Sequence, residues 1–133
     1  MFQVSAAAPV LTVSQIQDRL PLVRRIAGDL VSAWARILRT RSELEACQIS
    51  SGAEQRDMEQ ELVEQLDRLV SRVQGLIGEV EQLGGSFQEY RRGVVNFVTE
   101  RDGRHVLACW VPGESELRGW HEPNETAEQC KPF

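Results

Sequence analysis

The sequence has no apolar run of the roughly 20 residues that a membrane-spanning helix needs. Residues 1–13 contain an apolar stretch but no Lys or Arg ahead of it, so the basic start of a signal peptide is missing. Basic residues are also in deficit overall, because the net charge is -5, and this argues against nucleic acid as a partner. These absences predict a soluble, cytoplasmic protein that binds neither membranes nor nucleic acid.

Cysteine is scarce, with three residues in the whole chain. Cys47, Cys109 and Cys130 are widely spaced and odd in number, and they form no Cys-x-x-Cys pair. The spacing therefore predicts neither a disulfide framework nor a zinc-finger site. It agrees with a reducing compartment.

The patterns that are present divide a single domain, 1–133, into a helical hairpin at 12–84, a small β-sheet at 85–123 and a polar tail at 124–133 with no clear element. A chain of this length can bury a core, whereas a two-helix hairpin alone buries little apolar surface. We therefore predict an α+β protein in which an antiparallel sheet packs near the base of a long antiparallel hairpin.

The first predicted helix begins at Thr12, because Thr12 and Gln15 have the spacing of a capping box. Pro21 lies inside the helical pattern and is expected to kink the helix or to begin a second segment. Apolar residues recur at alternating steps of four and three, which is the spacing of a heptad seam. They are Ile16, Leu20, Val23, Ala27, Leu30, Trp34, Ile37 and Leu44, with Arg41 as the one interruption.

The second predicted helix follows a break at 48–52. Ser51 and Glu54 fit a capping box at its start, and Gly84 is placed to end it in the left-handed conformation. An apolar seam is joined by a flanking row at steps of seven, and a stripe this wide suits a bundle core better than a two-strand seam. The seam is Leu62, Leu66, Leu69, Val73, Leu76, Val80 and Leu83, and the flanking row is Val63, Val70 and Ile77.

Charge and glycine placement both favour pairing of the two helices. Residues 14–48 carry six Arg against four acids, and residues 54–83 carry eight acids against three Arg. Exposed pairs of this kind each add only about 0.2–0.5 kcal/mol. Gly28 is expected to lie opposite Gly75 and Gly78, and we favour a close approach of the helices over a binding groove as the explanation of these glycines.

The segments 94–99 and 105–111 are rich in β-branched and apolar residues, and Asp102-Gly103 between them is typical of a two-residue hairpin turn. Both faces of this hairpin are mainly apolar, so the helices are expected to cover one face and the tail or a second subunit the other. A third strand is predicted at 117–121. The turn sets the cross-strand pairs, which are Asn96 with Cys109, Val98 with Leu107, Phe97 with Ala108 and Val95 with Trp110.

One group of residues is a candidate metal site. The predicted register places Asn96 and Cys109 side by side, and His121 and Glu122 follow on the next strand. Cysteine, histidine and carboxylate groups are ligands that a transition metal such as zinc accepts. The same residues also suggest a Cys–His nucleophile, although only Glu122 is available as an orienting acid.

The structural alternative is simpler. A single cysteine on an apolar strand is typical of a small core residue, and we favour this interpretation over metal binding. Trp110 and Trp120 are expected to close the core between the sheet and the helices, with each indole N–H reaching an acceptor. The sequence contains no catalytic motif, so an enzyme is not favoured.

Over nearly its full length the chain resembles a small bacterial family known only as a domain of unknown function. The resemblance rests on Leu20-Pro21, the two long helices, and a C-terminal block of motifs. These motifs are Gly93 to Phe97, Asp102 to Arg104, Cys109-Trp110, Gly113-Glu114 and Trp120-His121. The resemblance implies the fold and a bacterial origin but no activity. Members of the family usually carry Asp where this chain has Asn96, which accepts a hydrogen bond but supplies no charge.

Two functions from different classes fit these patterns. The first is a non-enzymatic assembly or interaction module, which is expected to be a homodimer whose hairpins form a four-helix bundle, with a protein partner as a further expectation. The second is a metal- or small-ligand-binding protein that uses the region of Cys109 and His121. No cofactor is predicted for the first function.

Overall fold

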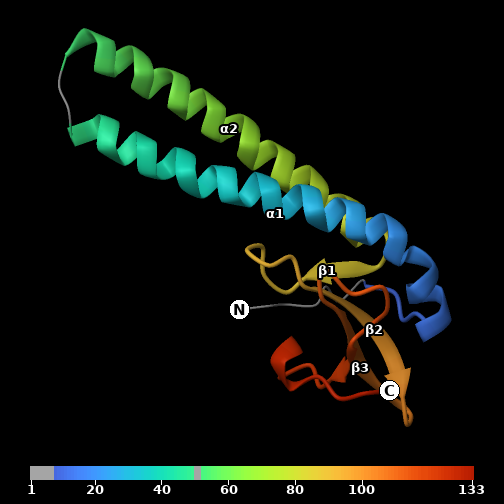
Figure 1. The fold of residues 1–133 in the computed structure, drawn as a ribbon. Coiled ribbons are helices and arrows are strands. Elements are labelled where there is room, and N and C mark those ends of the chain that lie inside the picture. The colour runs from blue at the N-terminus through green and yellow to red at the C-terminus, as the bar shows by residue number, and fades with distance from the viewer. Residues whose placement is uncertain (1–7, 50–51) are drawn as a thin grey trace.

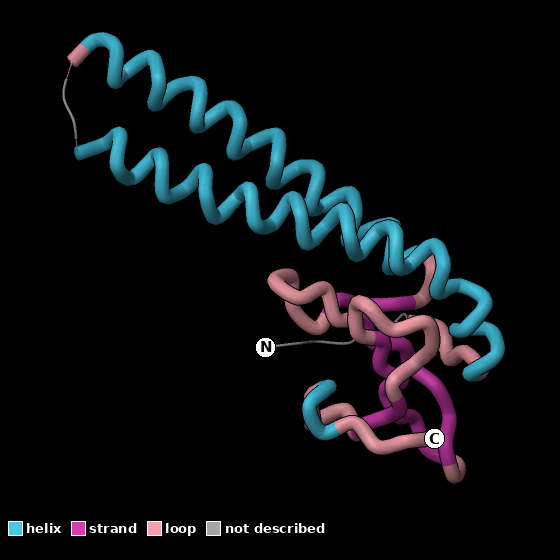
Figure 2. Tube along the Cα trace, viewed as in Figure 1, coloured by secondary structure: helices cyan, strands magenta, loops and turns pink. Residues whose placement is uncertain are grey.

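The computed structural model describes residues 8–49 and 52–133. Two long helices pack against each other, and a four-stranded antiparallel sheet follows them, which confirms the predicted α+β architecture (Figure 1). The sheet lies at one end of the hairpin, here called the base, and the connected end, here called the tip, extends away from it (Figure 2). The elements are α1 (Val13–Ile49), α2 (Ala53–Gln82), β1 (Gly85–Phe87), β2 (Val95–Arg101), β3 (Arg104–Trp110), β4 (Gly119–His121) and the 3-10 helix η1 (Ala127–Gln129).

Helix α1 begins as the capping box predicts. The Thr12 N–H donates to Gln15 Oε1 at 2.9 Å, and the Gln15 N–H donates to Thr12 Oγ1 at 3.1 Å. The helix then runs without a break through Pro21, so the prediction that Pro21 begins a second segment is wrong. Leu20, directly before the proline, and Val23, two residues after it, are only 1% and 0% exposed. Burial of these two side chains contributes about 3–6 kcal/mol, enough to offset the roughly 3 kcal/mol cost of an interior proline.

Helix α2 begins at Ala53 with Gly52 as its N-cap residue, and the predicted cap Ser51 lies outside the described residues. The helix ends at Gln82, and Gly84 follows it in the left-handed conformation as predicted, with a φ of +90°. The two helices are held mainly by their apolar seams. Within the described ranges, a single ion pair joins them, between Arg72 and Asp29 at 3.7 Å, and both side chains are half exposed. The opposite charges of the helices therefore contribute little to the hairpin itself.

The glycines of the helices do not mark a close helix–helix contact. A Cβ atom added at Gly28, Gly75 or Gly78 would meet no heavy atom within 4 Å, so the predicted close approach is wrong. These positions face open space, and the glycines weaken the helices through backbone entropy without a packing gain.

Replacement of Gly75 and Gly78 by Ala is therefore expected to stabilise the protein. Each substitution should raise the free energy of unfolding by about 1 kcal/mol, measured by urea denaturation. Gly93→Ala is the matched control and should lower the free energy of unfolding. Gly93 has a φ of +76°, and a Cβ atom added there would lie 2.7 Å from Val31 Cγ2. A loss of stability in the Gly75 and Gly78 variants would contradict the open environment described here.

The sheet has the strand order β1-β2-β3-β4, and its central hairpin is built as predicted. Asp102 and Gly103 have φ values of +52° and +78°, which are typical of a type I′ turn. All four predicted cross-strand pairs are confirmed, including Asn96 with Cys109 and Val95 with Trp110. Strand β4 is shorter than the predicted 117–121. Strand β1, which pairs with β2, was not predicted.

The two faces of the sheet belong to different cores. Phe87, Val95, Phe97, Ala108 and Trp110 face the helices and join the main core. The opposite face forms a small second core in which Val94, Cys109 and Ala127 are buried and Val111 and Cys130 are partly buried. This face was predicted to be covered by the tail or by a second subunit, and in the structure the tail covers it. The prediction that the tail has no element is wrong, because it contains η1 and its Lys131 bridges to Trp120.

The lengths and hydropathy of the two described helices show whether either could span a membrane. Neither has a stretch that is both long and apolar enough to cross a bilayer.

Candidate functional site

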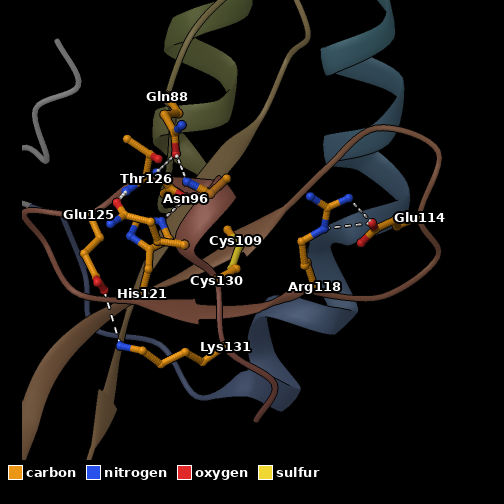
Figure 3. The surroundings of a disulfide bond; sticks show 12 residues. Gln88, Asn96, Cys109, Glu114, Arg118, His121, Glu125, Thr126, Cys130 and Lys131 are labelled. Carbon is orange, nitrogen blue, oxygen red and sulfur yellow. Dashed lines mark hydrogen bonds and ion pairs between the residues drawn. A yellow bond between two sulfur atoms is a disulfide. The ribbon is translucent and has the colours of Figure 1, made fainter.

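A buried polar cluster lies between the second face of the sheet and the tail (Figure 3). Its centre is a contact between Asn96 on β2, which is 1% exposed, and His121 on β4, which is fully buried. His121 Nε2 lies 3.2 Å from Asn96 Oδ1, and His121 Nδ1 lies 2.9 Å from the carbonyl oxygen of Glu122. The sheet register brings these residues together, because Asn96 and His121 occupy neighbouring cross-strand rows on either side of β3.

Gln88, in the loop after β1, connects this pair to the tail. Its Oε1 accepts from Asn96 Nδ2 at 3.2 Å and from the backbone N–H of Ala127 at 3.1 Å. The backbone N–H can only donate, so it fixes Gln88 Oε1 as the acceptor and the Asn96 amide nitrogen as a donor. Asn96 Oδ1 is then left to accept from His121.

The donor and acceptor roles of Gln88 and Asn96 are therefore fixed, and they determine what His121 meets. Both ring nitrogens of His121 face oxygen atoms that only accept, and a neutral imidazole has one N–H to donate. The neutral ring satisfies one of the two oxygens, and the protonated ring satisfies both. Sequence analysis did not identify Gln88, because a glutamine in a polar loop has no periodicity that marks it as part of a buried cluster.

Cys109 is joined to Cys130 in a disulfide, which the sequence analysis did not predict. The third cysteine, Cys47, lies in α1 and donates its thiol hydrogen to the Gln55 carbonyl oxygen at 3.0 Å. The expectation of no disulfide was wrong because an odd number of widely spaced cysteines does not say which two the fold brings together.

The four predicted metal ligands are only partly brought together. Asn96 and His121 touch, but the Cys109 sulfur is bonded to Cys130 and the Glu122 carboxylate pairs with Arg104. In the parts of the chain that the structure describes, no group of three His, Cys, Asp or Glu side chains is placed to hold a metal ion. Cysteine binds a metal or acts as a nucleophile as its thiolate, so either role of Cys109 requires the disulfide to be reduced first. Zinc binding here stays a prediction.

The two tryptophans of the sheet have different environments. Trp110 is 1% exposed in the main core, and its Nε1 donates to the Glu114 carbonyl oxygen at 2.8 Å, as predicted. Trp120 is covered by cations instead. Arg101 and Lys131 lie 4.9 Å and 4.6 Å from the centre of its indole ring. Its buried Nε1 meets no acceptor within the described segments, so the prediction of an acceptor for this residue is wrong.

Charged residues fasten the outside of the tail. The Thr126 hydroxyl and the Arg92 guanidinium form hydrogen bonds with Glu128 and lower the pKa of its carboxyl group from 4.5 to about 2. The lowered pKa means that these contacts stabilise the docked tail above about pH 4.5 and are lost as the pH falls toward 2. Arg92 and Glu128 are 56% and 55% exposed, so solvent screens their attraction.

Removal of the central amide should destabilise the protein. Asn96→Leu deprives His121 of its acceptor and Gln88 of a donor, so the free energy of unfolding is expected to fall by about 1–3 kcal/mol in chemical denaturation. His105→Leu alters an exposed residue of the same sheet and should change stability by less than about 0.5 kcal/mol. Equal effects of the two variants would show that the buried cluster does not support the fold.

Comparison with known proteins identifies a family but no relative of known activity. A family model described as "Uncharacterized conserved protein (DUF2203)" matches residues 10–133. No curated protein and no solved structure shows significant similarity to the chain.

Proposed function

We propose that this chain, which belongs to the uncharacterized conserved protein family DUF2203, is a non-enzymatic module that assembles through its helical hairpin into a homodimer. The observation that carries the proposal is a row of exposed apolar side chains that runs from the middle of the hairpin toward the tip. Leu38 on α1 is 41% exposed, and Val63 and Val70 on α2 are 37% and 39% exposed. We call these three residues the tip face.

The residues of the tip face lie on one side of the hairpin. Each directly follows a buried residue of the seam, because Leu38 follows Ile37, Val63 follows Leu62 and Val70 follows Leu69. One residue further along a helix is a rotation of about 100°. In two antiparallel helices this rotation has opposite senses when both are viewed from the same end. It therefore turns the side chains of both helices toward the same side of the pair.

This side is also the one that carries the sheet. Trp34 follows the buried Ala33, so it shares the side of Leu38. Its ring centre lies 5.3 Å from that of Tyr90, in the segment between β1 and β2. The sheet and its loops cover the base of this side, whereas the helices near the tip extend beyond them (Figure 1). The apolar stripe of the hairpin therefore continues past the part that its own chain covers.

The charges around the tip face suit a second copy of the same chain. Arg41 and Glu45 lie three and seven residues after Leu38, and Asp67 lies four residues after Val63, so all three flank the tip face. Arg56, seven residues before Val63, lies on the same stripe. All four are exposed and make no ion pair with another described residue. Because both signs are present, a two-fold related copy can set acids against these arginines and arginines against these acids.

The mass in solution tests the proposal. The wild-type protein at micromolar concentration should have twice the chain mass of 15.0 kDa by light scattering. Dissociation on dilution should restore the single-chain mass. A mass of 15.0 kDa throughout the micromolar range would contradict assembly through the hairpin.

A further inference from the structure

The tail is attached to the sheet by one covalent bond and a small set of weaker contacts. Lys131 and Trp120 exchange two backbone hydrogen bonds, of 2.7 Å and 2.9 Å, and the Ala127 N–H donates to Gln88. The covalent attachment is the disulfide from Cys109 on β3 to Cys130 (Figure 3).

Apolar burial under the tail is small. The apolar part of the second core has three buried residues in the described chain, Val94, Cys109 and Ala127, whereas the main core extends along both helices. The ion pair that joins the tail to the segment before β2, between Arg92 and Glu128, involves half-exposed side chains and adds little. The disulfide is therefore the contact whose loss changes the tail most.

We propose that the Cys109–Cys130 bond is a redox-controlled latch on the tail, closed by a low-molecular-weight disulfide and opened by a low-molecular-weight thiol. The latch does not depend on the hairpin dimer. It agrees with the predicted reducing compartment, because disulfides in such compartments are typically transient and redox-sensing.

The two sulfur atoms differ in access, and this sets the order of the opening reaction. Cys109 is 0% exposed, whereas Cys130 is partly exposed. The external thiolate attacks the Cys130 sulfur and forms a mixed disulfide with it, the bond between the Cys130 and Cys109 sulfurs breaks, and Cys109 leaves as a thiolate. A second external thiolate attacks the external sulfur of the mixed disulfide and releases Cys130. The two external thiols are oxidised to one disulfide. The protein gains two electrons, and it takes up two protons when Cys109 and Cys130 both become thiols.

Opening the latch has a defined structural consequence. Release of Cys130 and Ala127 removes the cover from Asn96 and His121, and it also frees the Cys109 thiol on the same sheet face. The reduced protein therefore presents a face on which a buried histidine, an amide and a thiol become accessible, whereas the oxidised protein keeps them closed.

Hydrogen exchange measured by mass spectrometry tests the latch on the full chain. Wild-type protein oxidised with glutathione disulfide is compared with the same protein in dithiothreitol. Reduction should speed amide exchange in residues 119–131 by about tenfold or more and leave α1 and α2 unchanged. Cys130→Ser should exchange like the reduced protein in both conditions. Cys47→Ser, which keeps the latch, should respond to dithiothreitol like wild type.

Two results would overturn the latch. One is exchange in residues 119–131 that is the same before and after reduction. The other is alkylation of all three cysteines when the glutathione-treated protein is denatured, because a closed latch leaves only Cys47 to react. Neither result depends on whether the hairpin forms a dimer.

Discussion

The double variant Val63→Glu, Val70→Glu is expected to be a folded monomer under conditions in which the wild type is a dimer. Both valines are more than one third exposed in the single chain, so the substitutions leave the core of the subunit intact. In the dimer, each carboxylate would be buried against apolar side chains without a partner. The cost of burying unpaired charge is about 3 kcal/mol or more, which raises the Kd by about a hundredfold or more.

Size-exclusion chromatography with light scattering checks this result, and circular dichroism checks that the helices remain. Leu22→Glu is the matched control, because Leu22 is 47% exposed on α1 but directly precedes the seam residue Val23, on the side of the hairpin away from the tip face. The control should keep the wild-type mass. A control that dissociates as the double variant does would mean that added acid, and not the tip face, governs assembly.

The second large effect is expected at Trp110. This side chain is 1% exposed and packs where the sheet meets the helices, so Trp110→Ala should lower the free energy of unfolding by about 3–5 kcal/mol. A loss of this size is a large part of the total stability of a domain, about 5–15 kcal/mol. The variant should therefore melt more than about 10 °C below wild type in a thermal scan.

Trp110→Phe separates the two contributions of the indole. Phenylalanine fills most of the volume but cannot donate to the Glu114 carbonyl oxygen, so this variant should lose about 1–3 kcal/mol. If the Ala and Phe variants were equally unstable, the hydrogen bond to Glu114 and not the packing of the ring would dominate at this position.

Features set by local chemistry could be predicted from the sequence. Thr12 and Gln15 form their capping box from neighbouring residues alone. Asp102-Gly103 fixes the register of β2 and β3 because a two-residue turn leaves one way to pair the strands. The register in turn places Asn96 beside Cys109, so half of the candidate site followed from one turn.

Features set by distant contacts could not be predicted. Pro21 has a strong local preference that burial of its neighbours overrides. The tail has no periodicity, and its order comes from Cys130, Lys131 and a backbone N–H that meets Gln88, 39 residues away. The prediction for the glycines of the helices was wrong for a related reason. A glycine in a helix has the same sequence pattern whether it faces a second helix or solvent.

Hydrogen exchange of the wild-type protein above and below its dissociation concentration tests most directly whether the tip face is the assembly surface. The account predicts that amides in residues 33–49 and 53–70 exchange more slowly in the dimer than in the monomer, whereas those of β2 and β3 are unchanged. The double variant with Glu at positions 63 and 70 serves as the monomer reference if the wild type does not dissociate on dilution. Protection on the sheet or the tail, with none near the tip, would contradict the proposed surface.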